Sequence, residues 1–394
     1  MNTISGTSVF DGRDMELEFN EEGIHDVREP QGPTSSESVE ACGRRFISPG
    51  FVDIQVNGYR GSDYSSEGFS EDDLHAIHGH LAEAGTTQHV PTIVTSPRDR
   101  LLRNLCVLAE VLDRDPLMQA AIPGIHIEGP YISSEDGPRG AHDAAYVRDP
   151  DYGEYREWQQ ASGNRIRIVT LAPERHGAIE FIEKLAADGV CVGIGHSAAD
   201  PDTIRRAVRA GARLSTHLGN GSHPEIPRLN NYIWEQLAQD DLWASIICDG
   251  YHLPDSVVKV FQRAKGVSGV ILVSDAALLG GRNSGIYKWG QIEVEVFPDG
   301  HLGLPGTSLL AGAAHLLDWD IAQCHRFTSL PLGAVIKLCT VNPARMLGIE
   351  DAITTEFSVG QPANLTVFRY SGAEHRLQIE ETWCGGKEIY AVSQ

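Results

Sequence analysis

Two histidines stand at the ends of two short apolar runs, and their type and placement suit a metal site. The runs Val190–Ile194 and Leu214–Leu218 have β-type composition, with His196 just after the first and His217 within the end of the second. The intervening segment, Asp200–Ala210, is predicted to be helical. A strand–helix–strand unit makes the strands parallel neighbours, so both imidazoles lie at the sheet edge where α/β proteins place their chemistry. Neutral imidazole is a good zinc ligand, and a metal site is favoured over two buried structural histidines.

Other polar side chains occur in or just after further apolar runs. They are Asp53, Gln55, Asn57, His126, Glu128, Asp249, His252 and Asp275. In a strand covered by helices, an ionisable side chain costs free energy unless it is paired or metal-bound. Any one of them can be a structural hydrogen-bonding residue, but their convergence on one edge favours an active site.

One carboxylate and two imidazoles make a zinc ligand set that leaves a fourth position open for water. Glu128, His196 and His217 are the expected ligands. Such a metal lowers the pKa of its water towards ~7 and polarises a carbonyl group. Asp275 is the expected general base, which takes the proton of the water and passes it to a leaving amine. The predicted chemistry is hydrolysis of an amide or a similar carbonyl compound.

The developing oxyanion needs a hydrogen-bond donor as well as the metal, and His142 or His252 could supply it. Structural roles compete with these assignments. Glu128 could cap the following turn, Asp275 could be a helix N-cap, and His142 could be an exposed loop residue.

Eight strand candidates must position these residues, and several are separated by helical stretches. The strands are expected at Phe51–Val56, Thr86–Val94, Ala121–Ile127, Arg165–Leu171, Val190–Ile194, Leu214–Leu218, Ala244–Cys248 and Gly269–Val273. The helices are expected at Glu71–Ala84, Arg98–Asp113, His176–Asp188, Asp200–Ala210 and Pro254–Ala264. This order predicts a (β/α)8 TIM-type barrel. A doubly wound open sheet is the alternative, but its first turn calls for G-x-G-x-x-G, which Phe51–Asn57 does not supply.

The two ends of the chain have β character and flank the barrel. Residues 1–48 and 357–394 are predicted to form one small split β-sandwich domain, with the barrel domain, 49–356, inserted between them. The alternating segment Ile286–Leu304 is expected to form a β-hairpin around Pro298–Gly300 above the barrel.

Composition limits the partners and the compartment. The 394 residues have a net charge of −22, which disfavours binding to nucleic acid or to an anionic membrane. Seven scattered cysteines without a C-x-x-C pair suggest reduced thiols and a cytoplasmic setting. No signal peptide and no apolar run of ~20 residues is evident, so no membrane association is expected.

An ordered set of segments resembles the N-acetylglucosamine-6-phosphate deacetylase family of the amidohydrolase superfamily. The segments are Pro49–Gly58, Pro91–Ser96, Gly124–Pro130, Gly195–Ser197, Thr216–Leu218, Asp249–His252, Ser274–Ala276 and Asn342–Arg345. The resemblance implies an enzyme of amino-sugar catabolism that releases acetate from N-acetylglucosamine 6-phosphate. Many amidohydrolases carry H-x-H at the end of strand one, where this chain has Gln55-Val-Asn57. Amides are poor zinc ligands, so one divalent ion is expected, with zinc the leading candidate.

The same resemblance implies roles for individual residues. It makes Glu128, His196 and His217 the metal ligands and Asp275 the general base and acid. It places His142, Asn220, Gly221, His252 and the turn Leu304-Pro305-Gly306 at the substrate. Arg228 matches an arginine that binds the phosphate, often across the interface of a homodimer.

The loop Gly219–Arg228 departs from the family pattern, with an additional His223 and prolines. This departure leaves the metal ligands intact but puts the sugar and the phosphate in question. A deacetylase of another N-acylated sugar is therefore an alternative.

Two further functions compete with the deacetylase. An amidohydrolase that opens a cyclic amide or deaminates a base would prefer two metals and a bridging lysine, yet no lysine stands at an expected strand end. A non-catalytic sugar-phosphate-binding protein would lack a ligand or the general base, yet all four residues are present.

Overall fold

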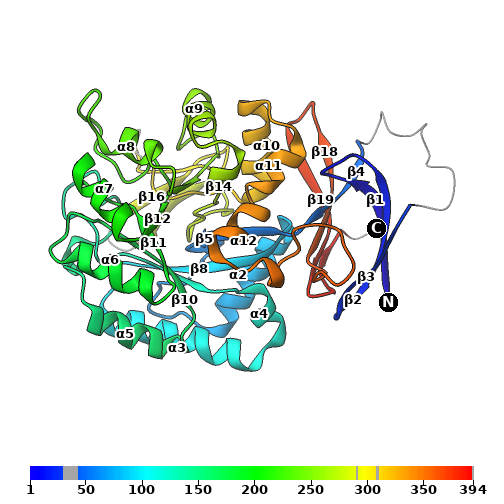
Figure 1. Cartoon of the computed structure of the whole chain (residues 1–394), viewed down its shortest axis with the longest axis horizontal. Coiled ribbons are helices and arrows are strands. Elements are labelled where there is room, and N and C mark those ends of the chain that lie inside the picture. Colours follow the sequence, from blue (N-terminus) through cyan, green and yellow to red (C-terminus); the bar gives the residue numbers. More distant parts are fainter. Residues whose placement is uncertain (30–42, 290–291, 308–309, 393–394) are drawn as a thin grey trace.

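The computed structural model describes residues 1–29, 43–289, 292–307 and 310–392. Eight parallel strands form its centre, in the order β14-β13-β12-β11-β10-β9-β8-β5 (Figure 1). They are β5 Phe51–Val56, β8 Thr86–Val94, β9 Ile125–Glu128, β10 Ile166–Leu171, β11 Cys191–Ile194, β12 Ala212–Ser215, β13 Trp243–Ile246 and β14 Val270–Leu272. Two short strands, β6 Gly58–Tyr59 and β7 Ser62–Asp63, follow β5 as a separate pair.

Backbone hydrogen bonds between the first and last strands nearly close this sheet into a barrel. At the carboxyl ends, Asp275 N donates to Gln55 O at 3.0 Å, and Asn57 N donates to Ala276 O at 2.9 Å. The segment 338–339 also connects the two strands, because Leu338 O accepts from Leu272 N of β14 and Cys339 O accepts from Val52 N of β5. The predicted TIM-type barrel is therefore confirmed over the open sheet, whose edge strands would stay unpaired.

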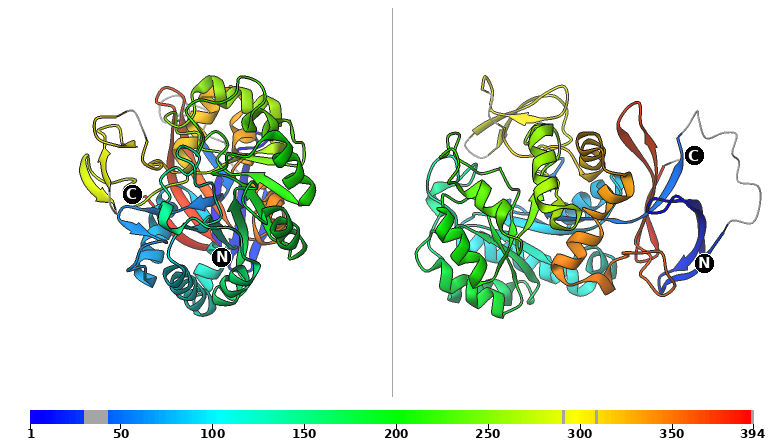
Figure 2. Two further views of the ribbon diagram at one scale, coloured as in Figure 1. Left: turned by 90° about the vertical axis from the view of Figure 1, so that its left-hand side faces the viewer. Right: turned by 45° about the horizontal axis from the view of Figure 1, so that its top comes forward.

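Eleven α-helices occur in the described part of the chain, and many of them cover the outside of the barrel (Figures 1 and 2). They are α2 Glu71–Glu83, α3 Arg98–Arg114, α4 Pro116–Ala121, α5 Tyr152–Ala161, α6 Ala178–Ala187, α7 Pro201–Ala210, α8 Tyr232–Ala238, α9 Asp255–Lys265, α10 Leu317–Thr328, α11 Leu332–Lys337 and α12 Val341–Leu347. Local signals set several boundaries. In α7, the side chain of Asp200 accepts from Thr203 N, Pro201 begins the helix, and Gly211 ends it in the left-handed conformation.

The five predicted helices occur within two residues of their expected boundaries, whereas two predicted strands have a boundary that was wrong by more than two residues. The strand expected at Leu214–Leu218 spans Ala212–Ser215, so it ends three residues earlier. Ala121 was expected to begin a strand but is the last residue of α4. The side chain of Asp115 caps this helix at its amino end, and Pro116 is its first residue. Strand β9 begins only at Ile125.

The second domain is built from both ends of the chain, as predicted. Its strands are β1 Asn2–Ser8, β2 Asp14–Asn20, β3 Gly23–Arg28, β4 Arg45–Pro49, β18 Leu365–Ser371, β19 Arg376–Cys384 and β20 Lys387–Ala391. They form one sheet in the order β20-β19-β18-β4-β1-β2-β3, and both termini lie in this domain (Figure 1). Phe19 of β2 meets Trp383 of β19 edge to face, with ring centroids 5.0 Å apart. Because these strands are not neighbours, the sheet must fold over its own apolar face, which gives it a sandwich-like core.

A three-stranded antiparallel sheet projects from one side of the barrel (yellow in Figure 2). It consists of β15 Gly285–Trp289, β16 Ile292–Val296 and β17 Leu302–Gly303, with Pro298–Gly300 between the last two. The expected hairpin is therefore present, with one strand more. This sheet, here called the flap, packs its buried face against Ala277, Leu279 and Ala311.

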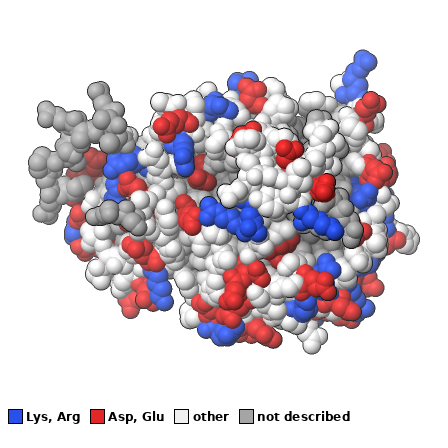
Figure 3. All heavy atoms as spheres, turned by 180° about the vertical axis from the view of Figure 1, so that it is seen from behind, with Lys and Arg blue, Asp and Glu red and all other residues white. Residues whose placement is uncertain are grey.

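Charged side chains of both signs are interspersed on the face shown in Figure 3. None of the helices that the structure describes combines the length and the apolar character that a membrane-spanning segment needs.

Candidate metal-dependent active site

A cavity of about 210 Å³ opens at the carboxyl ends of the barrel strands. Its wall consists of residues from the loops that follow most of these strands, together with residues of the flap and of the segment after it. They are Asn57, Asp63, Val94, Glu128, Gly140, Ala141, His142, His196, His217, Asn220, Gly221, His252, Asp275, Ala277, Trp289, Leu310 and Gly312. Four residues expected to do the chemistry, Glu128, His196, His217 and Asp275, therefore share one cavity.

The three expected ligands lie within reach of one ion. Glu128 Oε1 is 3.0 Å from Nε2 of His196 and 2.8 Å from Nε2 of His217. One ligand atom from each residue can be chosen so that all three lie within 4.8 Å of one another, and all three residues are buried. Burial opposes ionisation of Glu128, but its hydrogen bonds with the two histidines hold the pKa of this carboxyl well below its ordinary value.

The donor chemistry of His196 fits a metal ligand. Its Nδ1 lies 2.9 Å from the carbonyl oxygen of Pro138, which can only accept, so Nδ1 carries the proton. Its Nε2 contacts Glu128 Oε1 at 3.0 Å and Nε2 of His142 at 3.2 Å, and it is the atom that would face a bound ion. A backbone carbonyl on the far nitrogen is a common support for a ligating histidine.

The backbone turns sharply at three strand ends. His196, His217 and Asp275 have φ values of 51°, 32° and 49°, in the left-handed region that residues other than glycine rarely adopt. Each stands just past a barrel strand, and its side chain lines the cavity. Strained backbone of this kind is concentrated at functional sites.

Asp275 is held by two amides from the end of the first barrel strand. Gln55 Nε2 and Asn57 Nδ2 both donate to Asp275 Oδ1, at 3.0 and 2.7 Å, so Oδ2 is left for another partner. Burial, followed by the nearby charge of Glu128, raises the pKa of Asp275 to about 6. A carboxylate with a pKa close to neutrality suits a general base.

The two other histidines of the cavity are each held through Nδ1. Nδ1 of His142 lies 2.7 Å from Thr95 Oγ1, and burial lowers the pKa of His142 to about 3. Nδ1 of His252 lies 2.7 Å from Asp249 Oδ2, and Asp249 Oδ1 also accepts from the backbone N–H of Tyr251 and His252. The carboxylate of Asp249 therefore fixes the orientation of the His252 ring.

His126 lies inside the barrel, on the same strand as Glu128. Its Nε2 is 2.8 Å from Thr170 Oγ1, which is in turn 2.8 Å from Thr216 Oγ1. Burial lowers the pKa of His126 to about 4, so the ring is neutral. It is part of a hydrogen-bonded interior and does not line the cavity.

Some residues expected at the substrate do not line the cavity of this chain. Asn220 and Gly221 do line it. Arg228 is exposed in the loop after β12 and is not among the described residues that line the cavity. The turn Leu304-Pro305-Gly306 follows β17 and is also absent from the described cavity wall. Leu304 packs instead against the buried apolar residues of the flap.

Sequence reasoning did not identify Thr95, Trp289, Leu310 and Gly312 as residues of the site. Thr95 follows strand β8, and its place at a strand end was the available signal. The other three come from the flap and from the segment after it, so no strand-end pattern marks them.

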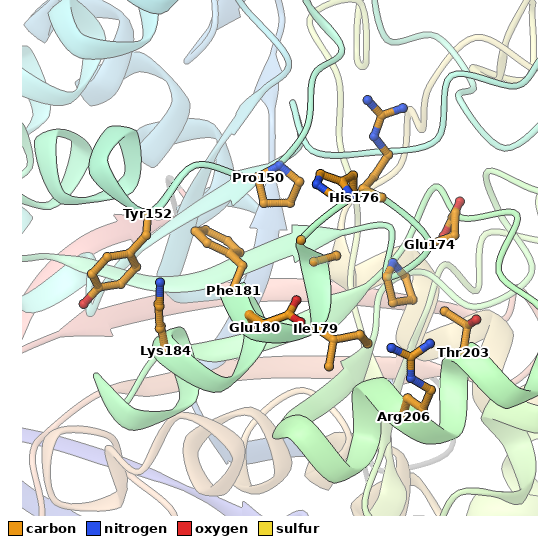
Figure 4. Close-up of a pocket in the computed structure, with 14 residues that line it drawn as sticks. Pro150, Tyr152, Glu174, His176, Ile179, Glu180, Phe181, Lys184, Thr203 and Arg206 are labelled. Carbon is orange, nitrogen blue, oxygen red and sulfur yellow. The ribbon is translucent and has the colours of Figure 1, made fainter.

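A second, larger hollow of about 650 Å³ lies elsewhere, around the amino end of α6 (Figure 4). Its lining mixes Glu174 and Glu180 with Arg175, Lys184 and Arg206. None of the expected catalytic or metal-binding residues belongs to it.

The comparisons with known proteins agree with this site. Residues 46–389 match the family described as "Amidohydrolase family". The chain is 31% identical over 340 residues to N-acetylglucosamine-6-phosphate deacetylase of Bacillus subtilis (strain 168), covering 86% of this chain and 84% of that protein. It is 32% identical over 370 residues to the Bos taurus protein of the same name, covering 90% and 85%. A mutant of the Mycobacterium smegmatis deacetylase, solved in complex with N-acetyl-D-glucosamine-6-phosphate, superposes with a TM-score of 0.85 at 27% identity, covering 98% of each chain.

A nearly closed parallel barrel with a Glu–His–His set at its mouth defines a metal-dependent amidohydrolase. The chain belongs to the amidohydrolase family and, within it, to the N-acetylglucosamine-6-phosphate deacetylases.

Proposed function

We propose that this enzyme hydrolyses N-acetylglucosamine 6-phosphate to glucosamine 6-phosphate and acetate. The observation that carries the proposal is the buried cluster of Glu128, His196 and His217 beside Asp275, in a chain of this family. The departure of the Gly219–Arg228 loop does not alter that cluster, since the loop contributes Asn220 and Gly221 to the wall and no ligand.

One divalent ion, Zn²⁺, is proposed to bind to Glu128, His196 and His217. One carboxylate and two imidazoles suit zinc, whereas side-chain amides such as those of Gln55 and Asn57, whose nitrogens donate to Asp275, are poor zinc ligands. When bound, the ion lowers the pKa of a water molecule and polarises the acetyl carbonyl.

The chain's own residues move the proton and orient the substrate. Asp275 Oδ2, which the amides leave free, takes a proton from the attacking water and then gives it to the nitrogen of the leaving amine. His142 and His252 contact the carbonyl and the sugar, and the rings are held for this by Thr95 and Asp249. Asn220, Gly221 and the turn Leu304-Pro305-Gly306 complete the substrate contacts.

The phosphate group requires a cation that this chain does not bring to its own cavity. No lysine or arginine is among the described residues that line it. We assign this role to Arg228, acting in the cavity of a second copy of the chain in a homodimer. The same exposed region carries Leu229, which is 77% exposed, and Trp234, which is 48% exposed. Apolar side chains exposed in this way suit an interface between subunits.

We also propose that the enzyme is located in the cytoplasm. The six cysteines of the described residues are all free thiols, which suits a reducing compartment. We also place the domain boundaries at 48/49 and 356/357, close to the end of β4 and before β18.

A panel of N-acetylated sugars, each with and without a 6-phosphate, tests the function through acetate release. The proposal expects turnover of N-acetylglucosamine 6-phosphate, its loss on chelation, and its recovery on adding zinc. Turnover of another N-acyl sugar, and not of N-acetylglucosamine 6-phosphate, would replace the proposed substrate with that sugar. No turnover of any sugar would favour a binding protein.

A further inference from the structure

We propose that Trp289 is the residue on which the pyranose ring of the substrate stacks, so that the flap determines how tightly the sugar binds. This inference rests on the proposed function, because it assumes that the cavity takes an N-acetylated hexosamine.

Trp289 stands at the tip of the flap. It is the last residue of β15 and pairs with Ile292 of β16. Side chains alternate along a strand, so Tyr287 and Trp289 share one face of β15, which is partly buried. Ile286 and Lys288 point to the other face and are exposed, Ile286 by 62%. The strand therefore directs Trp289 towards the barrel mouth.

The indole forms part of the same cavity wall as the catalytic residues Glu128, His142 and Asp275. Among the described residues that line the cavity, Trp289 is the one Phe, Tyr or Trp. The remaining apolar wall comes from small or aliphatic residues such as Ala277 and Leu310.

Small residues back the indole on one side. A Cβ added to Gly312 would lie 3.5 Å from two carbons of the Trp289 ring and 2.8 Å from Cβ of Ala277. Gly312 also has a φ of 84°, which other residues rarely adopt. The absence of a side chain at Gly312 thus allows the indole to pack closely beside the cavity.

Stacked rings hold the other end of the flap to the barrel. Neighbouring ring centroids are 4.1 Å apart in Phe297–His301, 4.7 Å in His301–Tyr251, 5.7 Å in Tyr251–His315 and 4.5 Å in His315–Trp319. Trp319 belongs to α10, and its Nε1 donates to the carbonyl oxygen of Asp249 at 2.9 Å. The stack therefore joins the flap to the loop that carries His252, so both sides of the cavity are held in one arrangement.

The chemistry of the ligand matches such a wall. A pyranose has apolar C–H faces and a rim of hydroxyl groups. Small-molecule sites use aromatic side chains for the apolar contact and a few polar groups for orientation. Since no lysine or arginine of the described chain lines the cavity, this contact has a large share in binding the sugar.

The test compares Trp289→Ala and Trp289→Phe with the matched control Ile286→Ala, from the exposed face of the same strand. For acetate release from N-acetylglucosamine 6-phosphate, Trp289→Ala should raise KM roughly tenfold and change kcat less than about threefold. Trp289→Phe should recover most of the loss, and Ile286→Ala should behave as wild type. Metal content should be unchanged in all three. In an Asp275→Asn background, calorimetry should show the same weakening of Kd with Trp289→Ala.

The inference is overturned if KM and Kd are unchanged in Trp289→Ala while the wild type releases acetate, and the proposed function then still stands. It is also overturned if Trp289→Ala loses metal together with activity, or if its main effect is new activity on longer N-acyl groups, because Trp289 would then support the ligands or bound the acyl pocket. If the wild type releases no acetate from any N-acetylated sugar, the proposed function fails first and the inference falls with it.

Discussion

At the scale of single residues, the site combines strained backbone with tightly held side chains. His196, His217 and Asp275 all have positive φ, at a cost of about 1–3 kcal/mol each. Asn and Asp tolerate this conformation better than most residues. Replacement of Asp275 by Asn is therefore expected to remove the proposed acid–base chemistry and to leave the backbone at this position undisturbed.

We expect Asp275→Asn to lower kcat by roughly 10³-fold, because the amide cannot take the proton of the attacking water. The metal content should equal that of the wild type, since Asp275 is not among the three ligands. Acetate release and elemental analysis on the same preparation measure both quantities. Activity near that of the wild type would remove Asp275 from the mechanism.

Asn57→Ala should lower kcat less than Asp275→Asn does, because Gln55 still donates to Asp275 Oδ1 in this variant. Removal of a residue that supports a functional side chain typically lowers activity roughly 10–100-fold. We expect a loss of kcat in that range with KM nearly unchanged. Loss of metal from this variant would mean instead that Asn57 supports the ligands.

At the scale of elements, helices and strands could be predicted because their signals are local. The five predicted helices and most of the strands lie within two residues of their observed boundaries. Two strands are exceptions, the one expected to begin at Ala121 and the one expected to end at Leu218. The error at Ala121 arose because the short helix α4 ends in an apolar run that favours a strand. The strand-end histidines and carboxylates could be found because parallel strands carry their ends to one edge. The place of Trp289 in the cavity wall could not be predicted, because it depends on how the flap packs against the barrel.

The loop after β12 packs directly on His196, one of the three proposed metal ligands. A Cβ at Gly221 would lie 2.6 Å from Nδ1 of His196 and 3.1 Å from the carbonyl oxygen of Pro138. We therefore expect Gly221→Ala to displace the ring and to lower metal occupancy at least severalfold. Gly12→Ala is the control, because Gly12 has a φ of 73° but nothing within 4 Å of its Cβ position. Equal metal content in the two variants would show that the close packing on His196 has no role.

At the scale of the whole molecule, the net charge of −22 opposes the approach of an anionic substrate. A local cation must compensate for this charge, and the proposed homodimer supplies Arg228 from a second subunit. Sequence alone could suggest this arginine only by family resemblance. Its location in the single chain, exposed and outside the cavity wall, gives the reason for requiring a second copy.

Arg228→Ala should raise KM for the phosphorylated sugar roughly 10–100-fold, since a charge-assisted hydrogen bond contributes about 1.5–3 kcal/mol. KM for the unphosphorylated sugar should not change. Arg209→Ala, another exposed arginine, is the control. An equal effect of Arg228→Ala on both sugars would show that it does not bind the phosphate, and a monomeric mass in solution would exclude the second copy.

The central claim is that one metal ion, held by Glu128, His196 and His217, makes this barrel a hydrolase. The most direct measurement is the metal-to-protein ratio of the purified enzyme and of its His196→Ala variant by elemental analysis. We predict about one zinc ion per chain in the wild type, and in the variant little metal and no acetate release. Full occupancy in the variant, or a catalytically active wild type without metal, would contradict the account.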